Sequence, residues 1–218
     1  MANDFTLYGY FRSSAAFRAR IALNLKGIKP ELHFIHLLKD GGQQHTPQYK
    51  ALNPQELIPA LVHDGHTITQ SLAIIEYLDE IVPEPPLLPK DAYGRACARE
   101  IAYAIACDIH PVNNLRVGQY LKRKEHANDD QIVSWQRHWI RVGFDALEKM
   151  LAASSLTGKF CHGDCATIAD ICLIPQIANA RRVKLDIETW PTLARIEAHA
   201  LTHPAFDAAL PKNQPDAE

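Results

Sequence analysis

The stretch FTLYGYFRSSAAFRARIALNLKG, residues 5–27, decides the fold of the first part of the chain. It opens with a short β-prone run at residues 5–8. Further on, apolar side chains such as Phe17 and Ile21 stand among basic ones in a pattern that favours a helix, and Gly27 supplies a helix stop. The stretch therefore predicts a strand, a turn and a helix.

A second strand is expected at residues 32–37 (LHFIHL), shortly after Pro30. One helix separates it from the first strand. A strand, a helix and a strand in this order predict a right-handed βαβ unit with parallel strands.

A hairpin and a third helix follow. Residues 60–63 (ALVH) and 66–69 (HTIT) flank Asp64-Gly65, and this dipeptide between apolar runs is a strong hairpin signal. Residues 71–81 (SLAIIEYLDEI) have helical spacing, with Ser71 as the expected N-cap. The predicted order, a βαβ unit followed by a hairpin and a helix, is the thioredoxin-like arrangement.

Beyond a connector with four prolines, residues 83–91, the strand signals vanish. Helices are expected at about 93–109, 111–124, 129–153, 167–181 and 190–200. Thr167 and Asp170 form an aspartate variant of the capping box at the fourth, and the polar residues 211–218 are expected to fray. The predicted fold is an α/β thioredoxin-like N-terminal domain and an all-α C-terminal domain, with limits at 1–82, 83–91 (linker) and 92–218.

The composition is that of a globular protein, with 218 residues, 47% hydrophobic and 22% charged, and a formal net charge of −2. This balance gives no support for a nucleic-acid partner or for an anionic membrane. The sequence has no run of about 18 apolar residues, which a membrane span would need. The start, MANDFTLYGYF, has no basic region followed by a long apolar stretch. We therefore expect a cytoplasmic protein.

The cysteines give no metal or disulfide framework. There are five of them, an odd number without regular spacing, which favours a reducing compartment. Cys161, His162 and Cys165 form the only cluster, and no second ligand pair follows at a zinc-finger distance. Loop and core cysteines are therefore expected rather than a metal site.

The candidate chemistry begins where the first strand gives way to the first helix. Residues 10–14 (YFRSS) place Arg12, Ser13 and Ser14 at this junction. Hydroxyls and unpaired amides at a helix start favour an anion or a thiolate. The alternative is that one serine merely caps the helix.

Two further motifs favour a bound peptide thiol. Ile58-Pro59 precedes the third strand, where a thioredoxin-like fold has a cis-proline that exposes the preceding backbone to an extended peptide. Gln70-Ser71 offers an amide, a hydroxyl and helix N-terminal amides to a carboxylate. An ordinary strand-edge proline and a simple N-cap are the alternatives for each motif alone. All three motifs in this order favour the peptide.

The motifs YFRSSAAFRARIALNLKGI, DGGQQ, ALNPQELIPAL, ITQSLAIIEYLDE and DCATIADICLIPQIANARR make the chain similar to the zeta class of glutathione transferases. That family includes the maleylacetoacetate and maleylpyruvate isomerases, and the resemblance covers residues 7–191. It implies glutathione as cofactor, a homodimer and Ser13 as the catalytic serine with Ser14 beside it. It also implies that glutathione is held by Gln44, Ile58, Pro59, Gln70 and Ser71, with His110 and Asn114 from the helical domain.

One position departs from the family pattern. The motif usually has serine-serine-cysteine, whereas the third position here is Ala15. Chemistry that uses the sulfur of glutathione needs no protein thiol at this position. The alanine puts in doubt only those side reactions in which the family cysteine takes part.

The resemblance implies a glutathione-dependent cis–trans isomerase of a maleyl keto acid. The carboxylates of such a small dicarboxylic keto acid are best bound by guanidinium groups. The candidates are Arg12, Arg116 and Arg182; the alternative for each is that it is an ordinary solvated surface arginine. Arg12 is also placed with the catalytic serines. Two other functions stay open: a transferase or peroxidase acting on small electrophiles such as haloacids, and a non-catalytic glutathione-binding protein.

Overall fold

The computed structural model describes residues 4–218. The chain divides into two compact units, one formed by Met1–Leu87 together with Thr202–Glu218 and the other by Leu88–Leu201. The expected domain limits stay a prediction. We name Thr202–Glu218 the return segment, because in it the chain comes back to the first unit.

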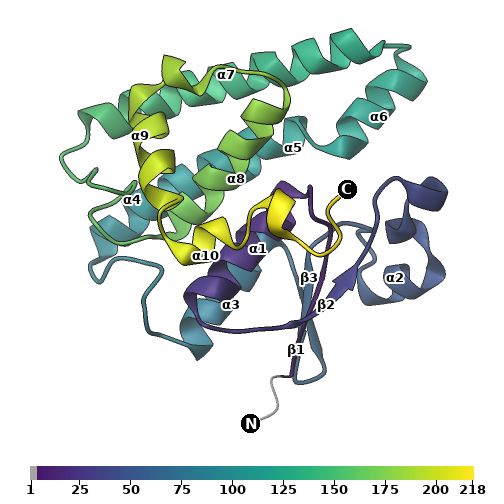
Figure 1. The fold of residues 1–218 in the computed structure, drawn as a ribbon, viewed down its shortest axis with the longest axis horizontal. Helices are drawn as coiled ribbons and strands as arrows, with labels where there is room; N and C mark the ends of the chain where they lie inside the picture. Colours follow the sequence, from purple (N-terminus) through teal and green to yellow (C-terminus); the bar gives the residue numbers. More distant parts are fainter. Residues whose placement is uncertain (1–3) are drawn as a thin grey trace. The chain divides into compact units, whose positions relative to one another are not determined.

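The first unit is built on a four-stranded sheet of order β2-β1-β3-β4 (Figure 1). β1 pairs with β2 in parallel, whereas β3 is antiparallel to both β1 and β4. The predicted βαβ unit and hairpin are therefore confirmed. The elements are β1 (Phe5–Gly9), α1 (Ser14–Leu25), β2 (Glu31–Phe34), α2 (Pro47–Leu52), β3 (Ala60–His63), β4 (His66–Thr69) and α3 (Ser71–Ile81).

The core of this unit lies between the sheet and two helices. Alternation along β1 buries Phe5 and Leu7, and α1 and α3 lie side by side against the sheet (Figure 1). Ala16 and Ala19 of α1 are fully buried, and such small side chains allow close packing. Helix α1 can therefore hold its N-terminus firmly at the end of β1.

Strand β2 is shorter than predicted. The strand expected over residues 32–37 ends at Phe34, because the chain turns away at His36. The backbone N–H of His36 donates to Oε1 of Gln43 at 2.8 Å, and the N–H of Gln43 donates to the carbonyl of His36 at 2.9 Å. These bonds satisfy the groups that a longer strand would have paired in the sheet.

The second unit is helical, as predicted. Its helices are α4 (Ala92–Tyr103), continued by a π-helical turn (Ala104–Ile109), α5 (His110–Val112), α6 (Leu115–Lys124), α7 (Asp129–Ala153), α8 (Ile168–Arg182) and α9 (Pro191–Ala200). The single helix expected over 111–124 is wrong, because Asn114 takes an extended conformation and caps α6. Within residues 4–218, the structure has no helix long and apolar enough to cross a membrane.

Helix α8 begins at the predicted capping box. Asp170 accepts hydrogen bonds from the N–H and hydroxyl of Thr167, at 2.8 and 3.0 Å, and from the N–H of Cys161 at 2.8 Å. Burial raises the pKa of Asp170, and the hydrogen bonds from Cys161 and Thr167 oppose this shift. The carboxyl group thus fixes both the start of α8 and the loop before it.

The return segment is ordered and packs beside α1 (Figure 1). It contains α10 (Pro204–Asp207), in which Phe206 is fully buried. The expectation that residues 211–218 fray is wrong. Gln214 donates to the carbonyls of Ala208 and Leu210, and Asp216 accepts from the first unit, so polar groups of these residues are paired in the fold.

Candidate functional site

Strand register gathers the three sequence motifs at one end of the sheet. Tyr8 of β1 lies opposite Ala60 of β3, which lies opposite Thr69 of β4. From this row of three residues the chain continues to the serine motif, to Ile58-Pro59 and to Gln70-Ser71. Strand pairing therefore brings together segments that are up to about sixty residues apart in sequence.

Ser13 caps α1 and leaves its hydroxyl hydrogen available. Its Oγ accepts from the N–H of Ala16 at 3.1 Å, and its own N–H donates to the carbonyl of Tyr10 at 3.0 Å. A hydroxyl that accepts one hydrogen bond can still donate another. Ser13 can therefore cap the helix and also donate a hydrogen bond to a thiolate, the two roles that the sequence leaves as alternatives. Ser14 is the first residue of α1.

The peptide between Ile58 and Pro59 is cis, as expected. Two side chains that sequence reasoning missed hold the residue before it. The carbonyl of Leu57 accepts from Oη of Tyr49 at 2.7 Å and from Nδ2 of Asn53 at 2.6 Å. Burial raises the pKa of Tyr49 to about 12, so its phenol keeps the proton that it donates. The turn-forming dipeptide Asn53-Pro54 was the available sequence signal.

The N-cap of α3 is Gln70 and not the predicted Ser71. Gln70 is the N-cap residue, with φ of 69°, a conformation that non-glycine residues rarely adopt and that is found at functional sites. Its amide Nε2 donates to Oε1 of Gln55 at 2.9 Å, a partner that sequence reasoning missed. Ser71 is the first helical residue and is buried, and its Oγ accepts from Nη1 of Arg18 at 3.3 Å.

Gln44 is a buried side chain with one acceptor left over. It is 5% exposed, and its Nε2 contacts the carbonyl of Leu37 at 3.4 Å and Nε2 of His45 at 3.0 Å. Its Oε1 has no hydrogen-bond partner among residues 4–218. A buried acceptor without a partner is costly unless a ligand supplies the donor. Gly42, with φ of 102°, leaves room for this side chain.

Arg12 is exposed beside Tyr10. Burial raises the pKa of the Tyr10 phenol, and the neighbouring Arg12 guanidinium opposes this shift by its charge and by a hydrogen bond. The guanidinium group thus lies at the loop that carries Ser13 and Ser14.

In the second unit, three expected residues share one short stretch. His110 begins α5, Asn114 caps α6 by accepting from the N–H of Arg116 at 3.1 Å, and Arg116 is exposed in the first turn of α6. The structure thus brings Asn114 and Arg116 together through the cap.

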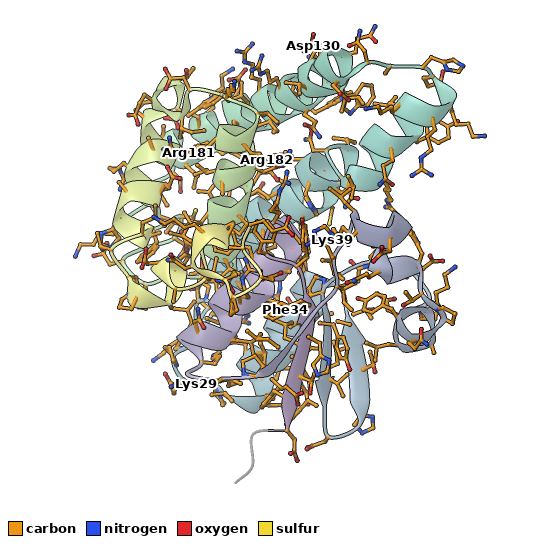
Figure 2. All side chains as sticks on the ribbon, turned by 45° about the vertical axis from the view of Figure 1, so that its right-hand side comes forward. Lys29, Phe34, Lys39, Asp130, Arg181 and Arg182 are labelled. Atoms are coloured by element: carbon orange, nitrogen blue, oxygen red, sulfur yellow. The ribbon has the colours of Figure 1, made fainter. Side chains whose placement is uncertain are left out.

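Arg182 is the last residue of α8 and lines a cavity rich in basic side chains. Its Nε and Nη2 donate to Oδ1 of Asn179 at 3.2 and 2.7 Å. Figure 2 shows it on the side of α8 away from Arg181. The cavity, of about 750 Å³, is lined by Asp130, Val133, Ser134, Arg137, His138, Arg141, Arg182, Val183 and Lys184. Such a surrounding suits an anion.

No group of three or more His, Cys, Asp or Glu side chains able to hold a metal occurs in the described part of the chain. Cys161 is buried and Cys165 is exposed. Burial raises the pKa of the Cys161 thiol well above its usual range, with the Asp170 carboxyl adding to the effect. A buried thiol that keeps its proton is a poor nucleophile.

Two family models match the chain. The model "Glutathione S-transferase, N-terminal domain" matches residues 3–80, and "Glutathione S-transferase, C-terminal domain" matches residues 140–209. The sequence is also similar to the maleylacetoacetate isomerase of Dictyostelium discoideum, with 49% identity over 99% of this chain and 97% of that protein.

Solved structures are similar over the whole length. A bacterial zeta-class maleylpyruvate isomerase in its holo form has 42% identity and a TM-score of 0.95, covering 98% of this chain and 100% of that one. A maleylacetoacetate isomerase from Methylobacterium extorquens AM1, with bound malonate and glutathione, has 41% identity and a TM-score of 0.94, covering 98% and 99%. The predicted two-domain fold is thereby confirmed.

Proposed function

Because the chain belongs to the glutathione S-transferase family, in its zeta class of maleylacetoacetate and maleylpyruvate isomerases, we propose that it catalyses the glutathione-dependent cis–trans isomerisation of a maleyl keto acid. The related structure with bound glutathione and malonate supports both a thiol cofactor and a dicarboxylate substrate. The substrate is a small dianion, maleylacetoacetate or maleylpyruvate, and the product is its fumaryl isomer.

The convergence of the three motifs on the row Tyr8–Ala60–Thr69 carries the proposal. The residues at this end of the sheet fit glutathione. Gln44 offers an unpartnered buried acceptor, and Ile58 and Pro59 offer backbone beside the cis peptide. Gln70 and Ser71 stand at the N-terminus of α3, where amides and the helix dipole favour a carboxylate. His110 and Asn114 are the proposed glutathione contacts from the second unit.

Bound glutathione would supply a thiolate that adds to the cis double bond and makes it a single bond, about which rotation is possible; breaking the carbon–sulfur bond again then restores the double bond as trans and returns glutathione. Ser13 favours the thiolate by donating its hydroxyl hydrogen to the sulfur, and the first amides of α1, with Ser14 among them, add a positive potential. A shift of ~2 pKa units, ~2.7 kcal/mol, from an ordinary thiol makes thiolate the major form near neutral pH.

The arginines have a separate task. Arg12, Arg116 and Arg182 bind the carboxylates of the substrate and the charge that develops on its ketone oxygen during addition. Arg12 does this beside the serine motif, and Arg182 does it at a cavity that four further basic or imidazole side chains line. We also propose a cytoplasmic homodimer, as expected for the family.

The test is an isomerase assay with purified protein, a catalytic amount of glutathione and each maleyl keto acid in turn. Loss of the cis-enedioate absorbance and recovery of unchanged glutathione are expected. Glutathione consumed in proportion to substrate indicates a transferase or peroxidase instead. Binding of glutathione without turnover of any maleyl acid indicates a non-catalytic binding protein.

A further inference from the structure

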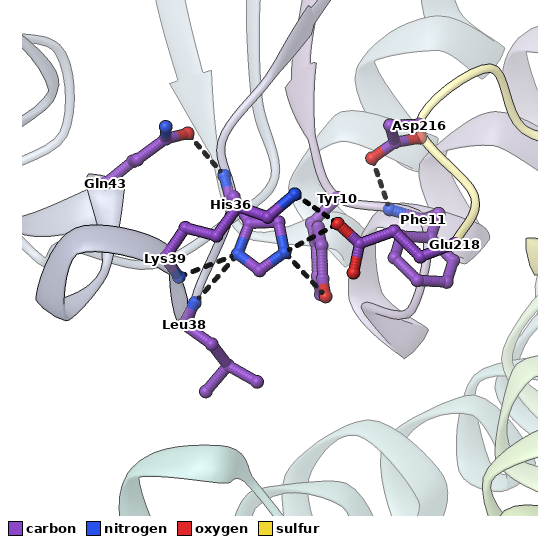
Figure 3. Close-up of polar contacts among 8 residues, drawn as sticks. All are labelled: Tyr10, Phe11, His36, Leu38, Lys39, Gln43, Asp216 and Glu218. Carbon is purple, nitrogen blue, oxygen red and sulfur yellow. Dashed lines mark hydrogen bonds and ion pairs between the residues drawn. The ribbon is translucent and has the colours of Figure 1, made fainter.

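The loop between β1 and α1 is held by a residue far away in sequence (Figure 3). The N–H of Phe11 donates to Oδ2 of Asp216 at 2.9 Å, and the carbonyl of Phe11 accepts from Nη2 of Arg20 at 3.1 Å. Both polar backbone groups of Phe11 are therefore fixed, two residues before Ser13.

Arg20 ties this loop to the return segment. It is 8% exposed, and besides Phe11 it donates to the carbonyl of Tyr10 at 3.4 Å. Its Nε and Nη2 donate to the carbonyl of Ala209 at 3.1 and 3.0 Å. Burial lowers the pKa of Arg20 to about 10, so the guanidinium stays charged near neutral pH and its hydrogen bonds stay charge-assisted.

Glu218 contacts a second loop (Figure 3). Nδ1 of His36 accepts from the N–H groups of Leu38 and Lys39, at 3.1 and 2.9 Å, so Nε2 carries the ring hydrogen. This Nε2 lies 3.4 Å from Oε1 of Glu218 and 3.5 Å from Oη of Tyr10. The Lys39 ammonium group also pairs with Glu218 and lowers its pKa.

The loop that Glu218 contacts leads to Gln44. Its first residue, His36, is bound through its backbone N–H and carbonyl to Gln43, the neighbour of Gln44. Asp216 thus contacts the loop of Ser13, and Glu218 contacts the loop of Gln44.

We propose that Asp216 and Glu218 are positioning residues that hold the Ser13 loop and the Gln44 loop in the arrangement that binds glutathione and directs the Ser13 hydroxyl to its sulfur. This inference rests on the proposed function. The physical reason is that hydrogen-bond stabilisation of a thiolate depends steeply on donor distance and angle, so a small displacement of Ser13 weakens it.

The first test is hydrogen–deuterium exchange without glutathione. It measures the protection of the Phe11 amide by Asp216 and does not depend on activity. Asp216→Ala should speed exchange at the Phe11 amide by ~10-fold, because the protecting acceptor is lost. Asp216→Asn should keep part of the protection, since its amide oxygen can still accept. The matched control is Asp207→Asn, which removes another exposed charge of the return segment. Unchanged exchange in Asp216→Ala overturns the proposal.

The second test measures the pKa of the glutathione thiol in the complex, by ultraviolet titration, and kcat/KM for the maleyl acid. Asp216→Ala and Glu218→Ala should each raise that pKa by ~0.5 to 1 unit and lower kcat/KM by ~3- to 10-fold, with partial recovery in Asp216→Asn. If exchange becomes faster but the thiol pKa and kcat/KM stay unchanged, the contacts of Asp216 and Glu218 only stabilise the loops, and the proposed positioning role is wrong. If glutathione bound to the wild-type protein forms no thiolate, the proposed function is wrong. The exchange comparison still decides whether Asp216 holds the Ser13 loop.

Discussion

Arg181 closes a two-pronged pair with Glu197, its Nε lying 3.1 Å from Oε1 and its Nη2 2.5 Å from Oε2. Hydrogen bonding to Glu197 raises the pKa of Arg181. Its sequence neighbour Arg182 binds Asn179 and lines the basic cavity. Two adjacent arginines of the motif NARR therefore have different environments, which makes them a matched pair for mutation.

Arg182→Met should lower kcat/KM for the maleyl acid by ~10²- to 10³-fold, the effect of losing one charge-assisted anchor for a carboxylate. Lysine at this position should recover only part of the loss, because a point charge lacks the two-pronged geometry. Glutathione affinity should hardly change. Normal isomerisation of both acids by Arg182→Met would return this arginine to the surface and leave Arg12 and Arg116 to bind the substrate.

Arg181→Met is the control, and it should act on stability instead. It leaves the carboxylate of Glu197, which is 8% exposed, without its partner. We expect a loss of ~1 to 2 kcal/mol in the free energy of unfolding, less than for a fully buried pair because the Arg181 side chain is half exposed. Urea unfolding measures the loss, and kcat/KM should stay near the wild-type value.

Ser13→Ala should impair both chemistry and stability. The thiol of bound glutathione should return toward its ordinary pKa, which reduces the thiolate fraction by about 20-fold near neutral pH. Loss of the N-cap of α1 should also cost ~1 kcal/mol, visible in urea unfolding. Ser13→Thr keeps both the cap and the hydroxyl and is the matched control. Near wild-type turnover by the alanine variant at neutral pH would contradict the catalytic role.

Ala15→Cys tests whether a protein thiol matters. Ala15 is 9% exposed in the first turn of α1, so the added sulfur enters a nearly closed position. The change should leave kcat/KM within ~3-fold, since the cofactor supplies the nucleophile. An inert wild-type protein and an active cysteine variant would show that the glutathione-thiol mechanism is wrong for this chain.

The Asp170 carboxyl predicts a pH dependence of stability. Burial raises its pKa in the folded state above the unfolded value, so the native protein holds this proton more tightly than the unfolded chain does. This contribution to stability is fully present below the unfolded pKa and is lost as pH rises through the folded one. Urea unfolding from about pH 3.5 upward should show this loss in the wild type and not in Asp170→Asn. Equal pH slopes in the two proteins would refute the assignment.

The sequence by itself determined the order of the elements and the motifs of the first unit. Asp64-Gly65 specifies the hairpin, because this dipeptide adopts the turn without help from distant residues. The capping box at Thr167 also depends only on residues within one helical turn. Local signals of this kind need no knowledge of the rest of the chain.

Tertiary structure decided which of these residues meet and what each one does. The early end of β2 and the Arg18 bond to Ser71 depend on partners from other elements. Arg181 and Arg182 are alike in sequence, and the positions of α9, which carries Glu197, and of α7, which lines the cavity, distinguish them. Residues 211–218 are polar and proline-punctuated, which predicts fraying, yet they are ordered. The reason is that Gln214 donates to the carbonyls of Ala208 and Leu210, and Asp216 accepts from the Phe11 amide, a partner that only the folded first unit brings within reach.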